Sequence, residues 1–436
     1  MRQWILGLIA LCASASVQAG MLTIEITGGV EGALPIAVVP FGFEGEGEPP
    51  VDIGAIVRAN LERSGRFAPL ANERLVARPH EGRDINFAEW RPLATENLVV
   101  GKVRTTGPGR YVVQFQLFDV FQGRQLAGYS IAATNRSLRR AAHQVSDIIY
   151  EQLTGERGAF DTLVAYIRVT RDAEGRATHV LAVSDADGHD EQIVLNSREP
   201  LMSPAWAPDG RRLAYVSFEN GRSEIFVQNI ITGQREKVAS WPGINSAPAW
   251  APDGRRLAMT LSHEGSPSIY VFDLESRRLH RITHGTAIDT EASWAPDGQS
   301  LIFTSDRSGP PQIYQVGINP DGSARGSVQR LTFEGRYNAR ASWSPNGRSI
   351  VMVHGADGGF RIALLDVASG RLRLLTRTLN DESPRFSPNG SMVIYATRHR
   401  QQGVLEVVSV DGRAHQRLVL RDGEVREPAW SPFKPE

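Results

Sequence analysis

The chain has 436 residues, enough for two domains that each bury a hydrophobic core. Its 48 lysines and arginines balance 48 aspartates and glutamates, and no basic stripe with interleaved aromatic residues occurs, which argues against nucleic-acid binding. The 42 glycines and 25 prolines form no low-complexity tract and are typical of a fold with many turns.

The first 19 residues have the pattern of a secretory signal peptide. Arg2 supplies a positive charge, residues 5–12 are apolar, and a small-residue cleavage site ends at Ala19. The apolar stretch is about half of the roughly 20 residues that cross a bilayer, and none later is long enough, so no transmembrane segment is expected. A lipid anchor at Cys12 is the alternative, but Leu11 is larger than the residue that lipoprotein signals place there. The mature chain then contains no cysteine, which suits an exported protein.

Residues 20–34 combine a short strand pattern with glycines, and are predicted to form a flexible N-terminal arm. Leu22, Ile24 and Ile26 alternate with polar residues, among them Glu25. Two interpretations stay open. The segment is either the first strand of the neighbouring sheet, which the residues alone favour, or a detachable arm that pairs with the sheet edge of a partner.

Residues 35–155 alternate strand and helix patterns and are predicted to form an α/β domain. Residues 36–41 are a continuous apolar run, as in a buried strand. Two segments, 51–65 and 137–155, have helical periodicity. Asp52 and Ser137 are their expected capping residues, and Gly65 and Gly155 are expected to end them. His143 lies in the second of these helices, where a structural histidine is expected rather than a catalytic one.

From residue 156 to 436 a sixfold repeat replaces the helical periodicity. A Trp-Ala/Ser-Pro-Asp/Asn-Gly segment recurs with starts 44, 44, 49, 43 and 44 residues apart. The six copies begin at Trp206, Trp250, Trp294, Trp343, Phe386 and Trp430. Each unit contains four short strand patterns, which is the arrangement of a β-propeller blade. The sequence therefore predicts an N-terminal α/β domain followed by a six-bladed all-β propeller with four antiparallel strands per blade.

The repeated segment has a structural explanation. Proline cannot donate to a strand ladder, Asp/Asn-Gly accepts the positive φ angles of a tight hairpin, and the tryptophan can wedge between blades. The strand pattern at residues 163–170 lacks this segment in front of it, whereas Trp430 has no strand behind it. The two ends of the propeller are therefore predicted to complete one blade and close the ring.

No catalytic residue, metal ligand or cofactor is expected, because no nucleophile elbow, zinc-protease motif or nucleotide-binding loop occurs. Residues 184–191 contain Asp185, Asp187 and Asp190, which hint at a calcium loop. The EF-hand spacing fails there, and an Asp-Gly hairpin turn is favoured.

Two enzyme classes have related sequence features. Similar repeats occur in serine peptidases with an α/β-hydrolase domain, but the chain ends six residues after Trp430 and its front domain lacks the nucleophile elbow. A free-standing propeller enzyme that acts on a small sugar or lactone in the tunnel is the alternative that stays open, since Glu291, Glu382 and Glu427 could supply carboxylates.

The residues just before each repeated segment should converge on one mouth of the tunnel, where propellers carry recognition. They differ from blade to blade and mix charges, amides and small side chains. They are Met202-Ser203, Asn245-Ser246-Ala247, Asp289-Thr290-Glu291, Asn338-Ala339-Arg340, Asp381-Glu382-Ser383 and Arg426-Glu427. This rim is interpreted as a protein-docking surface, against the alternative of an ordinary solvated rim.

The segments PIAVVPF, RSGRFAPL, DIIYEQLTGERGAFDT, SPAWAPDGRRLAYVSFENGRSEI, MVIYAT and EPAWSP resemble the TolB family of periplasmic proteins, in order and over essentially the whole chain. The resemblance implies a non-enzymatic component of the Tol–Pal envelope system of Gram-negative bacteria. Such proteins support outer-membrane integrity and constriction at cell division, and some colicins exploit them. The propeller mouth is implied to bind the lipoprotein Pal, and the mature N-terminal segment to bind TolA. A monomer is expected.

The resemblance places these roles on particular positions of this sequence. The implied Pal-facing residues are Ile244, Asn245, Ala247, Thr290 and Glu291, and their place on the same rim adds Met202, Ser203, Asn338, Arg340 and Glu382 to the predicted Pal-facing set. The implied TolA-binding residues are Leu22, Ile24, Glu25 and Ile26. Ile244 departs from the pattern, because the best-known members have a histidine there, and this puts one polar contact in doubt. The resemblance also suggests that the arm docks back on the body, so that Pal binding and TolA binding are coupled.

Overall fold

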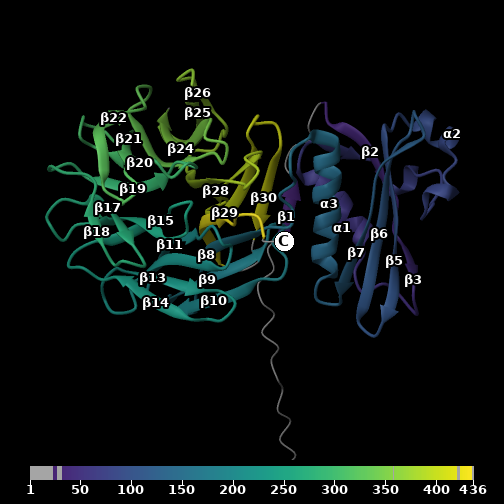
Figure 1. The fold of residues 1–436 in the computed structure, drawn as a ribbon, viewed down its shortest axis with the longest axis horizontal. Coiled ribbons are helices and arrows are strands. Elements are labelled where there is room, and N and C mark those ends of the chain that lie inside the picture. Colours follow the sequence, from purple (N-terminus) through teal and green to yellow (C-terminus); the bar gives the residue numbers. More distant parts are fainter. Residues whose placement is uncertain (1–22, 27–31, 357, 420–422, 435–436) are drawn as a thin grey trace, which may run out of the picture.

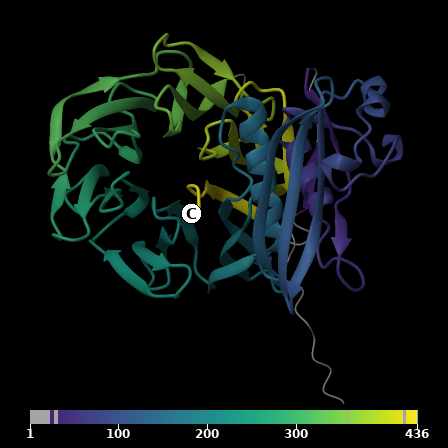
Figure 2. The same ribbon diagram turned by 45° about the vertical axis from the view of Figure 1, so that its right-hand side comes forward.

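The computed structural model describes residues 23–26, 32–356, 358–419 and 423–434. The predicted signal peptide and part of the predicted arm, including Leu22, lie outside the described residues. An α/β domain stands beside a ring of small β-sheets (Figure 1), and a turned view shows the sheets arranged around the centre of the ring (Figure 2). Among the described helices, none combines the length and apolar character needed to cross a membrane.

The α/β domain is built on one mixed sheet with the strand order β4-β2-β5-β6-β7, and β3 also pairs with β5. Its strands are β2 (Leu34–Val38), β3 (Gly42–Glu44), β4 (Phe67–Pro69), β5 (Asn97–Gly107), β6 (Arg110–Asp119) and β7 (Arg124–Thr134). Its helices are α1 (Ile53–Arg63), α2 (Phe87–Trp90) and α3 (Leu138–Thr154), with short 3-10 turns at Asn72–Arg74, Gly82–Asp84 and Arg91–Leu93. Strand β2 runs parallel to both neighbours, whereas β5, β6 and β7 form an antiparallel meander.

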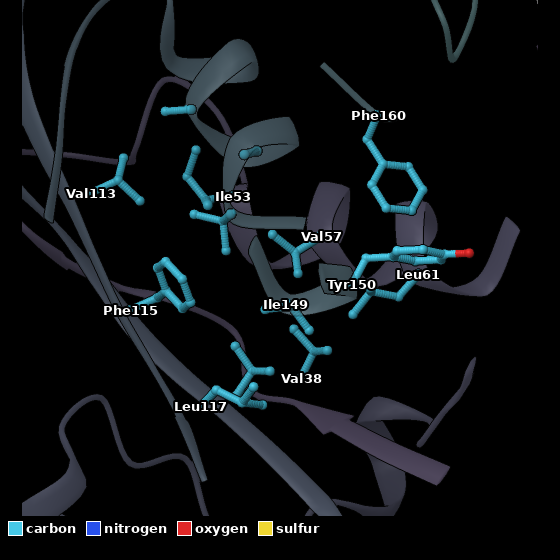
Figure 3. Close-up of a cluster of buried hydrophobic side chains, with 14 of the residues drawn as sticks. Val38, Ile53, Val57, Leu61, Val113, Phe115, Leu117, Ile149, Tyr150 and Phe160 are labelled. Carbon is cyan, nitrogen blue, oxygen red and sulfur yellow. The ribbon is translucent and has the colours of Figure 1, made fainter. Parts of the chain in front are cut away.

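The core of this domain lies between the sheet and the two long helices (Figure 3). Ile53, Val57 and Leu61 follow the four-residue spacing of one helical face of α1, and all three are at most 1% exposed. They meet side chains of β6 such as Phe115, and Tyr150 of α3. Burying a large apolar side chain contributes roughly 1.5–3 kcal/mol, so this face fixes the helices on the sheet.

The helix ends follow the sequence signals in part. Asp52 caps α1, accepting a hydrogen bond from the Ala55 N–H at 2.9 Å, and Gly155 ends α3 with a φ of 75°. The expectation that Ser137 caps α3 was wrong in detail. Its Oγ accepts from the Thr134 N–H at 2.9 Å, in the turn that leaves β7, and makes no bond to the first turn of the helix.

The propeller has six blades of four antiparallel strands, which confirms the predicted fold class. Blade 1 contains β31 (Glu424–Trp430), β8 (Leu163–Arg171), β9 (Ala177–Asp185) and β10 (Gln192–Ser197), and blade 2 contains β11 (Leu201–Trp206), β12 (Arg212–Ser217), β13 (Glu224–Asn229) and β14 (Arg235–Ala239). Blade 3 contains β15 (Asn245–Trp250), β16 (Arg256–Leu261), β17 (Ser268–Asp273) and β18 (Leu279–Arg281), and blade 4 contains β19 (Asp289–Trp294), β20 (Ser300–Ser305), β21 (Gln312–Ile318) and β22 (Ala324–Arg330). Blade 5 contains β23 (Tyr337–Trp343), β24 (Ser349–Ala356), β25 (Gly359–Asp366) and β26 (Leu372–Leu374), and blade 6 contains β27 (Glu382–Phe386), β28 (Met392–His399), β29 (Gln402–Ser409) and β30 (His415–Val419).

The ring closes as predicted, through its two ends. Strand β31, from the C-terminal end of the chain, pairs antiparallel with β8, the first propeller strand, and Trp430 lies opposite Val164. Blade 1 is therefore shared between the start and the end of the propeller, so that opening the ring requires breaking a strand ladder.

The repeated segment has the structural role that was predicted for it. In its first copy, Asp209 accepts the N–H groups of Arg211 and Arg212 at 2.8 and 3.1 Å, and Gly210 has a φ of 64°. The Trp206 indole donates to the Ala429 carbonyl at 3.0 Å, across the boundary between blades 2 and 1. Trp250 and Trp294 repeat this contact with the blade before them, at 3.2 Å. The tryptophans thus join neighbouring blades.

The N-terminal strand β1 (Thr23–Ile26) has a different neighbour from the one that its place in the sequence suggests. It does not extend the sheet of the α/β domain that follows it. It pairs antiparallel with β30 and adds a fifth strand to blade 6, with Glu25 opposite Arg417. The segment is a short strand on the edge of a distant sheet, which is the geometry of strand addition.

The two domains meet through polar contacts around the segment that joins them. Asp161 accepts Arg140 Nε of α3 at 2.9 Å and Lys434 Nζ of the C-terminal segment at 2.8 Å. Asn389 Nδ2, in the turn after β27, donates to the Arg157 carbonyl at 2.9 Å. The α/β domain therefore contacts the turns that follow the innermost strands, at one end of the tunnel.

Asp147, on α3 beside this junction, is predicted to make the stability of the protein depend on pH. Burial raises its pKa from 3.8 to about 6. Its carboxylate accepts hydrogen bonds from the N–H groups of Phe160 and Asp161, at 2.7 and 3.1 Å, and these bonds lower the pKa but only in part offset the effect of burial. The folded state therefore holds a proton that the unfolded state releases, and this contribution to stability is complete below pH 3.8 and lost as the pH rises through about 6.

The variant Asp147→Asn cannot titrate at this position. The free energy of unfolding of the wild type, minus that of the variant, is expected to fall by up to about 3 kcal/mol between pH 4 and pH 7. Urea unfolding of both proteins at several pH values measures this difference, in which all other titrating groups cancel. A difference that stays constant with pH would contradict the assignment.

Candidate functional site

The innermost strand of every blade bends at one residue with a positive φ. These residues are Ser203, Ala247, Glu291, Arg340, Ser383 and Glu427, with φ between 48 and 57°. The strand registers shift at the same places, so each bend is a β-bulge. A side chain in this region of φ costs of order 1 kcal/mol or more, and such strain is most often kept at functional sites. We call the end of the tunnel that these six residues surround the bulge mouth.

The bulge mouth encloses a cavity of about 160 Å³. Its lining comes from all six blades and includes each of the six bent residues. In each blade the chain enters the innermost strand at the bulge mouth and leaves it at the opposite end of the tunnel. The repeated Trp-Pro turns follow the innermost strands, so these turns and the α/β domain lie at that opposite end. The bulge mouth is therefore the end of the tunnel that the α/β domain leaves free.

One ion pair dominates the electrostatics of the bulge mouth. Arg340 Nε lies 2.9 Å from Glu291 Oε1, and Glu291 Oε2 accepts from Thr304 Oγ1 at 3.1 Å. Burial lowers the pKa of the Arg340 guanidinium, but the negative charges of Glu291, Glu427 and Glu382 raise it by more, so that the pKa lies above its ordinary value. Glu427 in turn accepts the backbone N–H of Ser203. Neighbouring blades are thus linked by charged hydrogen bonds at the cavity wall.

Arg385 is a lining residue that the sequence analysis missed. It lies two residues after the bend in blade 6 and borders both this cavity and the one at the tryptophan end of the tunnel. The other five blades have alanine or serine at that position: Ala205, Ala249, Ser293, Ser342 and Ala429. Burial, with Arg340 nearby, lowers the pKa of the Arg385 guanidinium. Alignment of the six repeats with one another would have revealed this one large, charged side chain.

The structure brings six of the ten predicted Pal-facing residues to the cavity wall. These are Met202, Ser203, Ala247, Thr290, Glu291 and Arg340. Glu382 lines the neighbouring groove, which it shares with Arg340. Ile244 is 44% exposed and lies directly before β15. Eight of the ten are therefore on or beside one surface.

The other two, Asn245 and Asn338, are completely buried. Asn245 Nδ2 donates to the Trp241 carbonyl at 2.7 Å, and its Oδ1 accepts the Trp241 N–H at 3.0 Å. Asn338 Nδ2 donates to the Glu334 carbonyl at 2.8 Å. Each amide folds the loop in front of its own strand. We therefore treat both residues as positioning residues for the rim, without direct contact to a partner.

Exposed apolar side chains occur on the segments around this mouth. Ile244 and Ile288 stand directly before the innermost strands of blades 3 and 4 and are 44% and 51% exposed. Phe333 and Leu379, on the segments that lead into blades 5 and 6, are 73% and 46% exposed. Exposed apolar side chains around a polar cavity are typical of a protein interface. Apart from Ile244, the sequence analysis missed them, although they recur at similar places in the repeat.

The predicted TolA-binding residues lie elsewhere. Ile24, Glu25 and Ile26 belong to β1, on the outer edge of blade 6. Blade 6 has the strand order β1-β30-β29-β28-β27, and its innermost strand carries Ser383 at the bulge mouth. One sheet therefore has the N-terminal strand on its outer edge and a cavity residue on its inner edge.

Comparison with known proteins identifies relatives over both domains. A family model described as the TolB amino-terminal domain matches residues 22–126, and one described as the TolB beta propeller domain matches residues 150–434. The Tol-Pal system protein TolB of Thioalkalivibrio sulfidiphilus is 62% identical over 414 residues, 94% of each chain. That of Nitrosococcus oceani is 58% identical over 437 residues, 99% of each chain. The crystal structure of TolB from Acinetobacter baumannii is similar with a TM-score of 0.86 and 41% identity, over 94% of this chain and 100% of that one.

Proposed function

The chain belongs to the TolB family of the Tol-Pal system, and from this premise we propose that it is a periplasmic, non-enzymatic scaffold protein. In this proposal the bulge mouth binds the lipoprotein Pal, and the N-terminal segment around β1 binds TolA. The protein would thereby support outer-membrane integrity and constriction at cell division.

The observation that carries the Pal assignment is the set of six bent strands with exposed apolar side chains around them. A docking partner gains from both features, because apolar contact supplies affinity and the charged wall supplies specificity. The Pal-facing residues in this proposal are Met202, Ser203, Ile244, Ala247, Thr290, Glu291, Arg340 and Glu382, with Asn245 and Asn338 as positioning residues and Arg385 as an addition.

A tunnel enzyme that acts on a sugar or lactone finds less support. Glu291 is paired with Arg340, Glu427 accepts a backbone N–H, and Glu382 lines the neighbouring groove rather than the tunnel cavity, so the three carboxylates do not converge on one point. Among the described residues that line the cavity there is no histidine. We therefore favour the scaffold.

The direct test is calorimetric titration of the mature protein with the soluble domain of its own Pal. Micromolar or tighter binding is expected. Absence of binding under conditions where both proteins are folded would remove the proposed function, and a screen of small ligands for the tunnel would then be the next experiment.

Pal and TolA are expected to weaken one another's binding. TolA can pair with the N-terminal segment only if β1 leaves β30, whereas docked β1 completes the sheet whose inner strand lines the bulge mouth. Saturating Pal should therefore raise the Kd of TolA about fivefold or more, as coupling energies of this kind usually do.

The measurement is a TolA titration with and without Pal. A variant that lacks residues 20–26 is the control, since it should lose TolA binding and retain Pal binding within about tenfold. Equal TolA affinities in the two titrations would show that the sites are independent.

A further inference from the structure

A buried histidine of the α/β domain faces two aspartates of the propeller. His143, on α3, is 1% exposed, and its Nε2 has no hydrogen-bond partner among the described residues. Asp187 Oδ2 and Asp185 Oδ2 lie 3.7 and 3.9 Å from this nitrogen. Asp185 is the last residue of β9, and Asp187 lies in the turn between β9 and β10 of blade 1. One ligand atom from each of the three residues lies within 4.8 Å of the others.

This arrangement requires an explanation, because a buried polar nitrogen without a partner is costly. At 3.7 and 3.9 Å, neither carboxylate makes a hydrogen bond to it. Zinc binds nitrogen and oxygen ligands at about 2.0–2.2 Å, so the corners of its tetrahedron are about 3.3–3.6 Å apart. The two spacings from the histidine nitrogen exceed this by about a few tenths of an ångström, and all three ligand atoms lie within 4.8 Å of one another, so the site must contract to hold the metal.

The imidazole is also held from its other side. Its other nitrogen, Nδ1, lies 3.0 Å from Asn60 Nδ2 of α1, and the same amide donates to Ser146 Oγ at 2.8 Å. In this arrangement Nδ1 accepts from the amide. With a metal on Nε2 the ring proton would move to Nδ1, the Asn60 amide would turn to accept it through Oδ1, and the Ser146 hydroxyl would donate to Oδ1 in place of the Ala142 carbonyl. Such outer partners fix the ring of a ligating histidine and raise its basicity.

Three cations compete with a metal for the aspartates. Arg63, buried at the end of α1, interacts electrostatically with Asp187. Arg139 Nη2 lies 2.5 Å from Asp187 Oδ2, and Lys434 Nζ lies 3.9 Å from Asp185 Oδ1. A carboxylate oxygen has two lone pairs, so Asp187 can bind a metal while it still accepts from Arg139. All three cations weaken the attraction for a dication, and an affinity below that of cysteine-rich zinc sites follows.

We propose that His143, Asp185 and Asp187 form a binding site for a transition-metal dication of the zinc class, which joins α3 to blade 1. The mixed nitrogen and oxygen ligands suit Zn²⁺, whereas Ca²⁺ and Mg²⁺ require more oxygen ligands than this junction offers. The proposal departs from the sequence-based expectation of no metal ligand. Because the ion would bind both domains in the folded protein only, it should raise thermal stability.

The test is titration of the chelator-treated, untagged mature protein with ZnSO₄ by calorimetry, together with thermal unfolding with and without Zn²⁺. One Zn²⁺ per chain and an increase in Tm are expected. His143→Gln and Asp187→Asn should each weaken this binding at least tenfold and remove most of the Tm shift. If His143→Gln does not fold, Asp187→Asn and Asp185→Asn decide the question, since both change partly exposed residues of one turn.

Matched controls come from the same turn. His189→Gln and Asp190→Asn remove potential ligands that are not part of the cluster, and both should bind Zn²⁺ like the wild type. The proposal is overturned if the wild type binds no Zn²⁺, if the controls lose as much affinity as the cluster variants, or if Ca²⁺ binds more tightly than Zn²⁺ at this site.

Discussion

Replacing Glu291 by lysine is expected to abolish binding of the Pal soluble domain while the propeller remains folded. The change puts a second cation beside Arg340, whose guanidinium now lies 2.9 Å from the Glu291 carboxylate. It also removes the acceptor of Thr304 at the cavity wall. Loss of a central interface residue costs about 2 kcal/mol or more, which corresponds to a loss of affinity of at least about 30-fold. Calorimetry measures the affinity, and circular dichroism shows whether the fold persists.

The control is a variant with the same change of charge at the opposite end of the strands. Glu275 lies in the turn between β17 and β18, and its side chain is 75% exposed. Glu275→Lys should bind Pal like the wild type. If Glu291→Lys also binds like the wild type, Pal does not dock on the bulge mouth. If both variants lose binding equally, long-range charge rather than this site governs the association.

Replacing Trp206 by alanine is expected to lower the free energy of unfolding by about 3–5 kcal/mol, as large-to-small changes of buried aromatic residues do. The side chain is 9% exposed and packs against residues of both blade 1 and blade 2. Its indole N–H donates to Ala429, on the strand that closes the ring. The alanine variant therefore loses packing and a bond across the closure. Guanidinium unfolding, followed by tryptophan fluorescence and circular dichroism, measures the change.

A pair of phenylalanine variants separates the hydrogen bond from the packing. Trp206→Phe keeps a large aromatic ring and loses the hydrogen bond to Ala429. We expect this variant to lower the free energy of unfolding by roughly 1 kcal/mol more than a tryptophan-to-phenylalanine change at a site without such a bond. Trp343→Phe is the matched case, because the Trp343 indole nitrogen has no hydrogen-bond partner among the described residues. Equal costs for the two variants would show that the indole bond contributes nothing to ring closure.

Most of the propeller could be predicted because its determinants are local and repeated. The turn chemistry of Trp-Ala-Pro-Asp-Gly acts within a few residues, and six copies at a nearly constant spacing leave little choice of architecture. The strand β1 shows the limit of this reasoning. Alternation identifies a strand, but the edge with which it pairs is determined by which sheet has a free edge in the folded molecule.

The candidate site was predictable to a similar extent. Position within the repeat placed Ser203, Ala247, Glu291 and Arg340 at one mouth. It could not distinguish these from Asn245 and Asn338, whose side chains turn inward to bind the loops before their strands. One residue of displacement along a strand moves a side chain to the opposite face, and the bulge at each bend alters that alternation.

By itself, then, the sequence determined the two kinds of domain, the sixfold ring and its closure. It also determined the end of the tunnel at which the variable residues gather. Each of these features follows from turns and strand periods that neighbouring residues specify. Only the tertiary structure decided what lies between the domains. Considered singly, His143 is a helix residue, Asp185 ends a strand and Asp187 belongs to the hairpin turn after it. The packing of α3 against blade 1 brings the three within 4.8 Å, and no local pattern encodes that contact, since it depends on how two separately folded surfaces fit together.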